Sequence, residues 1–452
     1  MGVWLETGLG VELRTEGIGR VLAALVGALA AAPDTRVIVA LGKWSEKPFR
    51  ALLADWHIPP ASVEVLASRD RFFLDSVRER AQAMLPAPNW SGRGRIRRAI
   101  EPLRDAVRRV RYGTRRVMSA LEFSGLARSA NRRGVDVWFV PHPTAHRARA
   151  LTAPIVVAVP DLVYVHMPEV FPPSLTSDID LRVRRLVPRA AAVISYSRFV
   201  ADRHVSAYLG VDPSRVHVVP HGSFDAAARL AARPGDGPGR RARAAQLVRD
   251  FLGSQAPVRF EEIEYLFVTT QVRPYKNYLN LFSAFARLRS RRSAPLKLVF
   301  TGSLDALLEG VPVREHLVRA GLEADVISMS SLPSDVHAAF FQLAVLTVVP
   351  TLFEGGFPFP FYESLSVDTP VVISAIPVTL EIVPQDLQPV MLFPPNDVAA
   401  MAGRIEWALG HRSELLRRQQ ALFVELRRRT WADAAKDYVA ILKGAAGGRA
   451  RR

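Results

Sequence analysis

Two carboxylates in the carboxy-terminal half of the chain lie close to a diglycine. Glu354 precedes Gly355 and Gly356 directly, and Glu363 follows nine positions after Glu354, all within residues 348–377. A diglycine loop lets bare backbone approach a ligand closely. A helix that begins after such a loop offers amides that favour an anion or a hydroxyl-rich group. This spacing predicts a binding loop with two acidic side chains.

Two cations lie earlier in the same half. Arg273 and Lys276 are three positions apart and follow a predicted strand at residues 265–270. Paired cations beside a helix amino terminus suit a diphosphate, because charge-assisted hydrogen bonds and helix amides converge there. We therefore expect these residues to bind a diphosphate.

Apolar runs on both sides of the acidic loop predict the elements that position it. Residues 345–349 and 371–374 are short and apolar, as in buried parallel strands. Residues 361–365 between them indicate the first turn of a helix. Strand, loop, helix and strand in this order predict a ligand site at the carboxyl end of an open α/β sheet.

The acidic segment resembles the diglutamate motif of glycosyltransferase family 4, the retaining, sugar-nucleotide-dependent enzymes of the GT-B fold. The resemblance implies that Glu354 and the amides of Gly355, Gly356 and Phe357 contact the transferred sugar. It also implies that Glu363 holds the ribose of the donor. The two glutamates lie one position farther apart here than is usual in that family.

The resemblance extends to the rest of this half. It implies that Arg273 and Lys276 bind the donor pyrophosphate and stabilise the leaving nucleoside diphosphate. It places Gly302 and Ser328 near the nucleotide, with Leu332 closing the stretch that contacts the base. The cations would do the work of a metal, so we expect neither a metal nor a cofactor.

The first strand, predicted near residues 2–5, leads to Gly17, Gly19 and Arg20, with a helix expected from about residue 21 to 32. A Gly-x-Gly at this place could indicate a dinucleotide site, but Leu22 occupies the position of the third glycine. We therefore exclude a nicotinamide or flavin cofactor. The resemblance implies that this loop lies near donor phosphates and acceptor, and a plain strand-to-helix turn is the structural alternative.

Another strand, at residues 155–160, ends in Pro160 and Asp161. This end resembles the family's His-Asp-Leu segment on the acceptor side, with Pro160 in place of the histidine. Asp161 is thereby a candidate acceptor-side base. His142 and His146 lie four positions apart, but without a third ligand we expect a histidine pair and no metal site.

The predicted fold is α/β with GT-B architecture: two Rossmann-like, doubly wound parallel-sheet domains. A chain of 452 residues exceeds one ordinary core. We predict an amino-terminal acceptor domain at 1–222, a linker at 223–262 and a donor domain at 263–430. By the same resemblance, a helix from 431 to 452 is expected to cross back to the first domain and end in a basic tail.

Residues 91–133 contain thirteen arginines and three acidic residues, and contribute most of the net charge of +17. Apolar residues recur there at helical spacing, which predicts a basic amphipathic helix. Such a helix can bind an anionic membrane surface, or it can pack on its own domain. Few aromatic residues interleave with the arginines, so we expect no nucleic-acid partner.

The composition is that of a globular protein, with 49% hydrophobic residues. The chain has no cysteine, which excludes disulfides and thiolate metal sites and fits a reducing compartment. No apolar run is long enough to span a bilayer, and no signal peptide is recognised. We expect a cytoplasmic protein that is peripheral on the membrane.

The resemblance implies a retaining hexosyltransferase. By resemblance it would move a hexose, with mannose as our guess, from a nucleotide sugar to a glycan or lipid-linked acceptor in cell-envelope synthesis. The alternatives are a GT-B epimerase or hydrolase, and a non-catalytic basic nucleic-acid or scaffold protein on a transferase fold. Product analysis without acceptor and nucleotide-dependent thermal shifts would separate them.

Overall fold

The structure, a computed structural model, describes residues 1–7, 13, 17–33, 35–68, 122–231, 239–330 and 332–447. Most of the basic segment 91–133 lies outside the described residues, so its predicted amphipathic helix and membrane role stay predictions. The predicted domain boundaries also stay predictions.

Fifteen strands have bounds within the described residues. They are β1 (Gly2–Leu5), β2 (Val37–Leu41), β3 (Val63–Ala67), β4 (Trp138–Val140), β5 (Ile155–Ala158), β6 (Ala192–Ser195), β7 (Val216–Val218), β8 (Tyr265–Val268), β9 (Lys297–Phe300), β10 (Leu307–Leu308), β11 (Val311–Pro312), β12 (Val326–Ser328), β13 (Leu346–Val349), β14 (Val371–Ser374) and β15 (Leu392–Phe393).

Helices connect most of these strands. The α-helices are α1 (Gly17–Ala31), α2 (Lys43–Asp55), α5 (Val163–His166), α6 (Pro173–Leu186), α7 (Ala226–Leu230), α8 (Arg240–Leu252), α9 (Tyr278–Arg291), α10 (Val313–Ala320), α11 (Ser334–Leu343), α12 (Phe359–Ser366), α13 (Pro377–Ile382), α14 (Gln388–Met391), α15 (Val398–Gly410), α16 (Arg412–Arg427) and α17 (Trp431–Gly447). A π-helix, η5, covers Val200–Tyr208, and short 3-10 helices include η2 (His146–Ala150) and η8 (Pro274–Lys276).

Two large sheets organise these elements. One has seven strands in the order β3-β2-β1-β4-β5-β6-β7, and the other has six in the order β12-β9-β8-β13-β14-β15. The registered pairs of both sheets are parallel, for example Val3 with Val39 and Leu266 with Leu298. Parallel strands joined by helices confirm the predicted α/β class with two doubly wound sheets.

The chain divides into two compact units. The first contains Met1–Ala158, Ile179–Val193 and Tyr438–Arg452, and the second contains Val159–Asp178 and Ile194–Asp437. The six-stranded sheet lies in the second unit. Segments that follow β5 and β6 belong to that unit as well, and this matters for the site described below.

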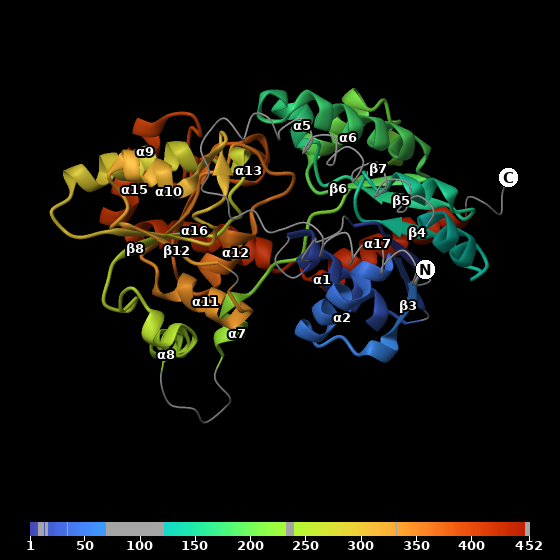
Figure 1. Cartoon of the computed structure of the whole chain (residues 1–452), viewed down its shortest axis with the longest axis horizontal. Helices are drawn as coiled ribbons and strands as arrows, with labels where there is room; N and C mark the ends of the chain where they lie inside the picture. The colour runs from blue at the N-terminus through green and yellow to red at the C-terminus, as the bar shows by residue number, and fades with distance from the viewer. Residues whose placement is uncertain are drawn as a thin grey trace, which may run out of the picture. The chain divides into compact units, whose positions relative to one another are not determined.

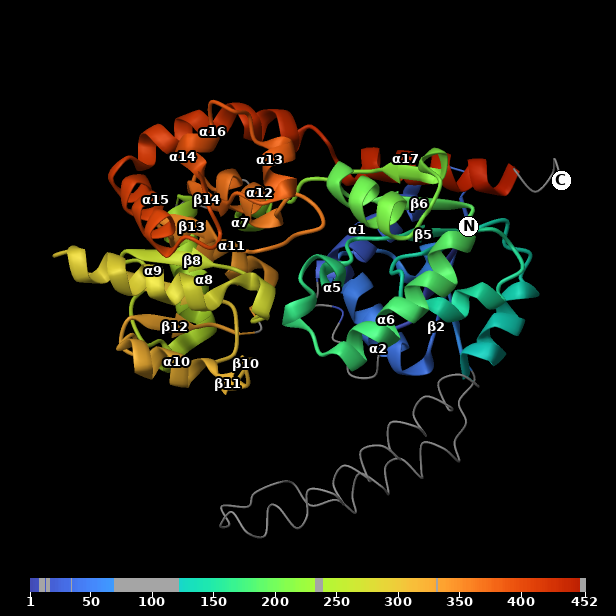
Figure 2. The same cartoon turned by 90° about the horizontal axis from the view of Figure 1, so that it is seen from above.

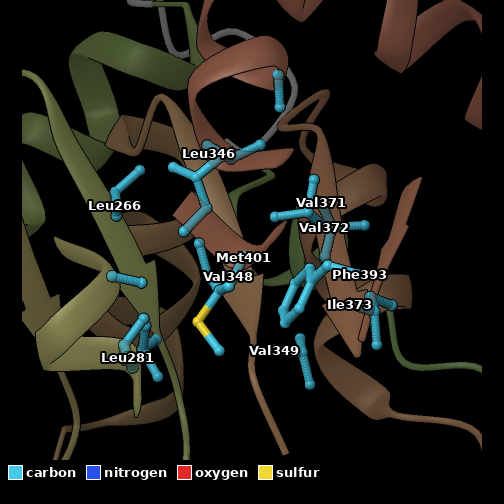
Figure 3. Packing of buried hydrophobic residues seen from close by; sticks show 14 of the residues in the cluster. Leu266, Leu281, Leu346, Val348, Val349, Val371, Val372, Ile373, Phe393 and Met401 are labelled. Atoms are coloured by element: carbon cyan, nitrogen blue, oxygen red, sulfur yellow. The ribbon is translucent and has the colours of Figure 1, made fainter. Parts of the chain in front are cut away.

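Helices cover both faces of the six-stranded sheet (Figure 1). Leu266 and Val268 of β8 pack with α9 and α15 on one face, where the core shown in Figure 3 also includes Leu346 and Met401. The alternate residue Phe267 packs against α8 and α11 on the other face. This alternation is the period of two expected of a strand that is buried on both sides. Helices α14, α15 and α16 lie together along one side of this unit (Figure 2).

Aromatic side chains fill the core of the first unit. Trp4 on β1 meets Trp138 on β4 edge to face, with ring centroids 6.3 Å apart, and meets Phe123 at 5.5 Å. Leu22, Leu25, Val26 and Leu29 make one buried side of α1, as the helical spacing predicted.

Two predicted helix boundaries were wrong, and one strand was missed. Helix α1 begins at Gly17, so Gly17, Gly19 and Arg20 form its first turn and no separate loop. Helix α12 begins at Phe359, which places Glu363 in its second turn. Strand β3 was missed, because this edge strand is only half-buried over most of its length and lacks a continuous apolar run.

Candidate functional site

A buried asparagine fixes the turn that carries Lys276. Pro274 begins the short helix η8, and Asn277 ends it in the left-handed conformation, with φ of 61°. The Asn277 side-chain amide donates to the carbonyl of Pro350 at 2.9 Å and to that of Pro395 at 2.7 Å. Asparagine tolerates this conformation and can bond locally, which explains its position here. The turn is therefore tied to the end of β13.

The loop that carries Glu354 is held against the same turn. The backbone N–H of Leu352 donates to the carbonyl of Tyr275 at 2.8 Å, and the Thr351 hydroxyl donates to the carbonyl of Phe353 at 2.8 Å. Lys276 Nζ lies 2.5 Å from Glu354 Oε1, and their side chains are 16% and 24% exposed. The structure therefore brings together the predicted cation and the first predicted carboxylate as a solvent-accessible ion pair.

Gly355 lies where only a glycine fits. A Cβ at this position would meet the carbonyl oxygen of Pro160 at 1.9 Å. The Ser197 hydroxyl donates to the carbonyl of Gly355 at 2.9 Å and accepts the backbone N–H of Val200 at 3.3 Å. Contacts with segments far away in the sequence, after β5 and β6, thus set the shape of the glycine loop.

Gly356 is packed less tightly. An added Cβ there would lie 3.1 Å from Cβ of Tyr196 and 3.5 Å from the His221 ring. The Tyr196 and His221 rings are themselves in contact, with centroids 3.9 Å apart. Burial lowers the pKa of His221 to about 3, so its imidazole is neutral at physiological pH.

Asp161 lies beside the glycine loop. Its Cβ is 2.9 Å from the position that a Cβ on Gly355 would take, and its carboxylate accepts the backbone N–H of Val163 at 3.0 Å. Burial raises the pKa of the Asp161 carboxyl, and the charge of Glu354 raises it further, against the Val163 hydrogen bond and Lys276. A carboxylate whose pKa is raised accepts a proton more readily than an ordinary one, which suits it to act as a base.

Glu363 is buried on α12, with 3% of its surface exposed. Its Oε1 lies 3.8 Å from Nδ1 of His337, and Nε2 of His337 is 2.6 Å from the Thr269 hydroxyl. Thr269 directly follows β8, so a series of polar side chains, Thr269, His337 and Glu363, connects the end of this strand with α12. Glu363 and Lys276 therefore belong to neighbouring connections at the carboxyl end of the same sheet.

The residues predicted to contact the nucleotide lie at the ends of β9 and β12. A Cβ on Gly302 would meet Val272 at 2.6 Å, and the Ser328 hydroxyl donates to the carbonyl of Gly302. Leu332 is half-buried against the core behind α11. Gly302 and Ser328 are thus in contact with each other. Gly302 also lies close to Val272, which directly precedes Arg273.

Arg273 is exposed and points toward Gln271, whose side-chain oxygen lies 2.7 Å from Arg273 Nη2. Phe357 packs edge to face against Phe361, with centroids 5.0 Å apart. Both residues lie beside the Lys276–Glu354 pair in sequence.

The remaining predicted residues belong to the first unit. A Cβ on Gly19 would meet the carbonyl oxygen of Leu13 at 1.8 Å, so this glycine permits a close approach of two backbones. Gly17 and Arg20 lie in the same helical turn. The His142 ring bonds Thr144, and no group of three or more potential metal ligands occurs within the described part of the chain.

Several residues of this site were not predicted. Asn277, Ser197, Tyr196, His221 and His337 all support predicted residues, yet their partners are far away along the chain. Only Asn277 carried a local signal, since asparagine after a Pro-containing turn favours the left-handed conformation.

The two-sheet architecture is that of the GT-B glycosyltransferases, as its structural neighbours establish. The structure of Anabaena Alr3699/HepE in complex with UDP and glucose aligns with a TM-score of 0.65 and 16% identity, over 98% of this chain and 99% of that one. Sucrose-phosphate synthase from Thermosynechococcus elongatus aligns with a TM-score of 0.63 and 14% identity, over 98% of each chain.

Sequence comparison points in the same direction for part of the chain. Residues 254–421 match the family model described as "Glycosyl transferases group 1", which covers less than half of the chain. The MMP alpha-(1->4)-mannosyltransferase of Mycolicibacterium hassiacum is 31% identical over 135 residues, or 29% of this chain. The matched region spans 31% of that relative. Together these similarities support a GT-B glycosyltransferase.

Proposed function

We propose that this protein is a retaining glycosyltransferase of family 4 that moves a hexose from a nucleoside-diphosphate sugar to a hydroxyl group. The observation that carries the proposal is the ion pair of Lys276 and Glu354, held beside a glycine loop at the carboxyl end of the six-stranded sheet. This is the place where open α/β sheets bind their ligands.

Each charged residue has a role in this proposal. Lys276, with Arg273, would neutralise the diphosphate that leaves with the nucleoside. Glu354 and the amides of Gly355, Gly356 and Phe357 would bind the sugar. Glu363 would hold the ribose, because a carboxylate accepts strong, charge-assisted hydrogen bonds from hydroxyl groups.

Asp161 is the proposed acceptor-side base. Its contact with the glycine loop and its raised pKa support this role. The reaction would proceed at the front face of the sugar with retention, and we name no protein nucleophile. Gly302, Ser328 and Leu332 would border the nucleotide, while Gly17, Gly19 and Arg20 would border the acceptor or the phosphates.

The donor and the cellular setting are proposed from the similarities to other proteins. The match to a mannosyltransferase supports mannose as the transferred sugar, and the UDP-bound neighbours support a nucleotide-sugar donor. Lys276 and Arg273 would do the work of a divalent cation, so we propose that no metal is needed. Among the described residues, no helix is long and apolar enough to cross a membrane. A cytoplasmic, peripheral location and a role in envelope polysaccharide or glycolipid synthesis complete the proposal.

The test combines a donor screen with two variants. Mass spectrometry of reactions with a panel of UDP-, GDP- and ADP-sugars should reveal one donor that is consumed and one glycosylated product. With that donor, Lys276→Ala should lower kcat by about 10²–10³-fold, because one preorganised charge is removed from the transition state. Glu363→Ala should weaken donor binding about tenfold to a hundredfold, the value of a hydrogen bond to a charged group.

Matched controls separate these effects from general damage. Lys436→Ala removes an exposed lysine of α17, and Glu406→Ala removes an exposed glutamate of α15. Both should leave kcat and donor binding unchanged. If Lys276→Ala and Glu363→Ala behave like these controls, the proposed site is wrong.

A further inference from the structure

His337 lies between the end of β8 and the carboxylate of Glu363. Its Nε2 is 2.6 Å from the Thr269 hydroxyl, and its Nδ1 is 3.8 Å from Glu363 Oε1. Thr269 follows β8, His337 belongs to the first turn of α11, and Glu363 belongs to α12. The first turn of α11 follows β12 in the chain, and α12 follows β13. One imidazole thus joins three connections at the carboxyl edge of the six-stranded sheet.

Aromatic packing holds this imidazole in one orientation. Phe341, one turn later in α11, meets the ring edge to face, with centroids 5.1 Å apart and planes at 84°. Phe267 of β8 lies 5.9 Å away, and the His337 side chain is only 17% exposed. A ring that is packed against two phenyl groups and bonded at one nitrogen has little freedom left. Its second nitrogen is therefore held toward Glu363.

Hydrogen-bond chemistry determines which nitrogen of the neutral ring carries the proton. An ionised carboxylate can only accept hydrogen bonds, so the favourable tautomer has its N–H at Nδ1, facing Glu363. Nε2 is then an acceptor, and the Thr269 hydroxyl donates to it. At 3.8 Å the attraction between Nδ1–H and Glu363 is electrostatic and not a direct hydrogen bond. Thr269 thus sets the tautomer that turns the positive edge of His337 toward the carboxylate.

Glu363 benefits from such a neighbour because it is nearly excluded from water. A buried carboxylate costs free energy unless polar groups replace the water that it has lost. A carboxylate also has about four acceptor positions, so an oxygen that His337 approaches can still accept a hydroxyl group of a ligand. The imidazole can therefore orient the carboxylate and leave it able to bind.

We propose that His337 is a positioning residue for ribose recognition. It holds the Glu363 carboxylate in the orientation that accepts the ribose hydroxyls of the donor, and Thr269 fixes the tautomer that does so. This inference rests on the proposed function, in which Glu363 binds the ribose. The diphosphate separates the ribose from the glycosidic bond that breaks. His337 should therefore affect donor binding and leave the chemical step almost unchanged.

The first experiment measures ribose recognition apart from transfer. Isothermal titration calorimetry of the full chain compares UDP, GDP and ADP with their 2′,3′-dideoxy forms. The wild type should bind one of these ribonucleotides at least about tenfold more tightly than its dideoxy form, because hydrogen bonds to a charged group are lost. Glu363→Ala should lose this ribose preference.

A matched pair of substitutions tests His337 itself. His337→Phe keeps an aromatic ring against Phe267 and Phe341 but has no polar atom, so the ribose preference should fall to about twofold or less. His337→Asn places an amide N–H near the position of Nδ1 and should keep most of the preference. His411→Phe makes the same change at an exposed position and should bind like the wild type. Equal ribose preferences in His337→Phe and His337→Asn would overturn the inference.

Thr269 provides an independent test that does not depend on the folding of a His337 variant. Thr269→Val keeps the shape of the side chain but removes the hydroxyl that donates to Nε2. The imidazole can then carry its proton on either nitrogen, so the ribose preference should fall. Thr269→Ser restores the hydroxyl and should restore the preference. The same preference in both variants would contradict the tautomer that the inference requires.

Steady-state kinetics with the donor found in the screen separate binding from chemistry. His337→Phe should raise KM for the donor about tenfold and change kcat by less than about twofold, because the ribose is bound alike in the ground state and the transition state. A fall in kcat with an unchanged KM would contradict the inference.

Glu363→Ala separates this inference from the proposed function. If none of the three nucleotides binds, or if Glu363→Ala keeps the ribose preference, the donor site of the proposed function is wrong and the inference falls with it. If Glu363→Ala loses the preference while His337→Phe keeps it, the donor site stands and only the role of His337 is wrong.

Discussion

Lys276 and Glu354 satisfy each other when no ligand is bound, and this pairing has a consequence for the proposed chemistry. A partly exposed ion pair contributes little to folding, because solvent screens the attraction and both side chains lose entropy. Breaking the pair to bind a diphosphate and a sugar therefore costs little free energy. The pair keeps both groups ready in position and neutral as a unit until the donor arrives.

The first residue-scale prediction concerns the pH dependence of Asp161. Because the pKa is raised in the folded protein, the folded state holds the proton more tightly than the unfolded chain, where the pKa is about 3.9. Above that pH the ionised carboxylate therefore destabilises the fold. Asp161→Asn should raise the melting temperature at pH 7, and the gain should shrink as the pH falls toward 4.

Asp212 provides a control of opposite sign. Hydrogen bonds from the backbone and side chain of Ser214 lower the pKa of this exposed carboxyl. Its ionised form therefore stabilises the fold above the unfolded pKa, and that contribution is lost in acid. Asp212→Asn should lower the melting temperature slightly at pH 7, and this loss should shrink as the pH falls below about 4. Equal pH responses in the two variants would contradict the environment described for Asp161.

The second residue-scale prediction compares two neighbouring glycines. Gly355→Ala places a Cβ 1.9 Å from a backbone oxygen of Pro160, and neither backbone can move away without loss of the Ser197 hydrogen bond. We expect destabilisation of about 1–3 kcal/mol and a large loss of transfer activity. Gly356→Ala meets side-chain atoms only, Cβ of Tyr196 at 3.1 Å and the His221 ring at 3.5 Å, and should cost clearly less. Denaturant unfolding of both variants measures the difference.

At the scale of elements, the turn around Asn277 holds the site together. The two carbonyls that its side chain binds belong to Pro350, after β13, and Pro395, after β15. One side chain thus joins three connections at the same edge of the sheet. Because Lys276 directly precedes Asn277, any movement of this turn also moves the proposed catalytic cation.

Two substitutions at Asn277 separate its two roles. Asn277→Ala removes both hydrogen bonds and places alanine at a positive φ, and should destabilise the protein by about 2–4 kcal/mol. Asn277→Gly also removes the hydrogen bonds, but glycine adopts the left-handed conformation without strain. This variant should therefore be more stable than Asn277→Ala by about 1 kcal/mol. Both should lower kcat more than they raise KM for the donor. Equal stability of the two variants would show that the left-handed conformation is not under strain.

Much of this element-level organisation could be predicted from sequence, for a physical reason. Buried parallel strands such as β1, β13 and β14 are continuous apolar runs, and these were located to within about one residue. The π-helix after β6 and the edge strand β3 could not be located in this way. Their hydrogen bonding depends on neighbours in the fold, and their side-chain pattern carries no period that identifies them.

The site was predictable only in its reactive residues. Glu354, Lys276 and Glu363 lie in patterns that can be recognised along the chain. Ser197 and Pro160 lie more than 150 positions before Gly355 in the sequence, and nothing in the local residues indicates that they meet the glycine loop. Supporting contacts of this kind become visible only when the chain is folded.

At the scale of the whole molecule, the charge of +17 is distributed unevenly. The described part of the chain contains many arginines that are neutralised in ion pairs, such as Arg289 with Asp325 and Arg249 with Glu261. Residues 91–133 have thirteen arginines and only three acidic residues. The excess charge is thus concentrated in this one segment, and it is the part of the chain that an anionic surface would attract most strongly.

This excess predicts binding to anionic membranes. Each arginine near such a surface contributes about 1 kcal/mol, so neutralising Arg104, Arg108, Arg109 and Arg111 together should weaken binding by at most about three orders of magnitude. Co-sedimentation with vesicles of phosphatidylserine and phosphatidylcholine should show binding that falls steeply as salt is raised. A control with glutamine at Arg287, Arg291, Arg314 and Arg319 removes the same charge from exposed positions of the second unit. If both variants bind equally, overall charge attracts the protein to the membrane and the basic segment has no special role.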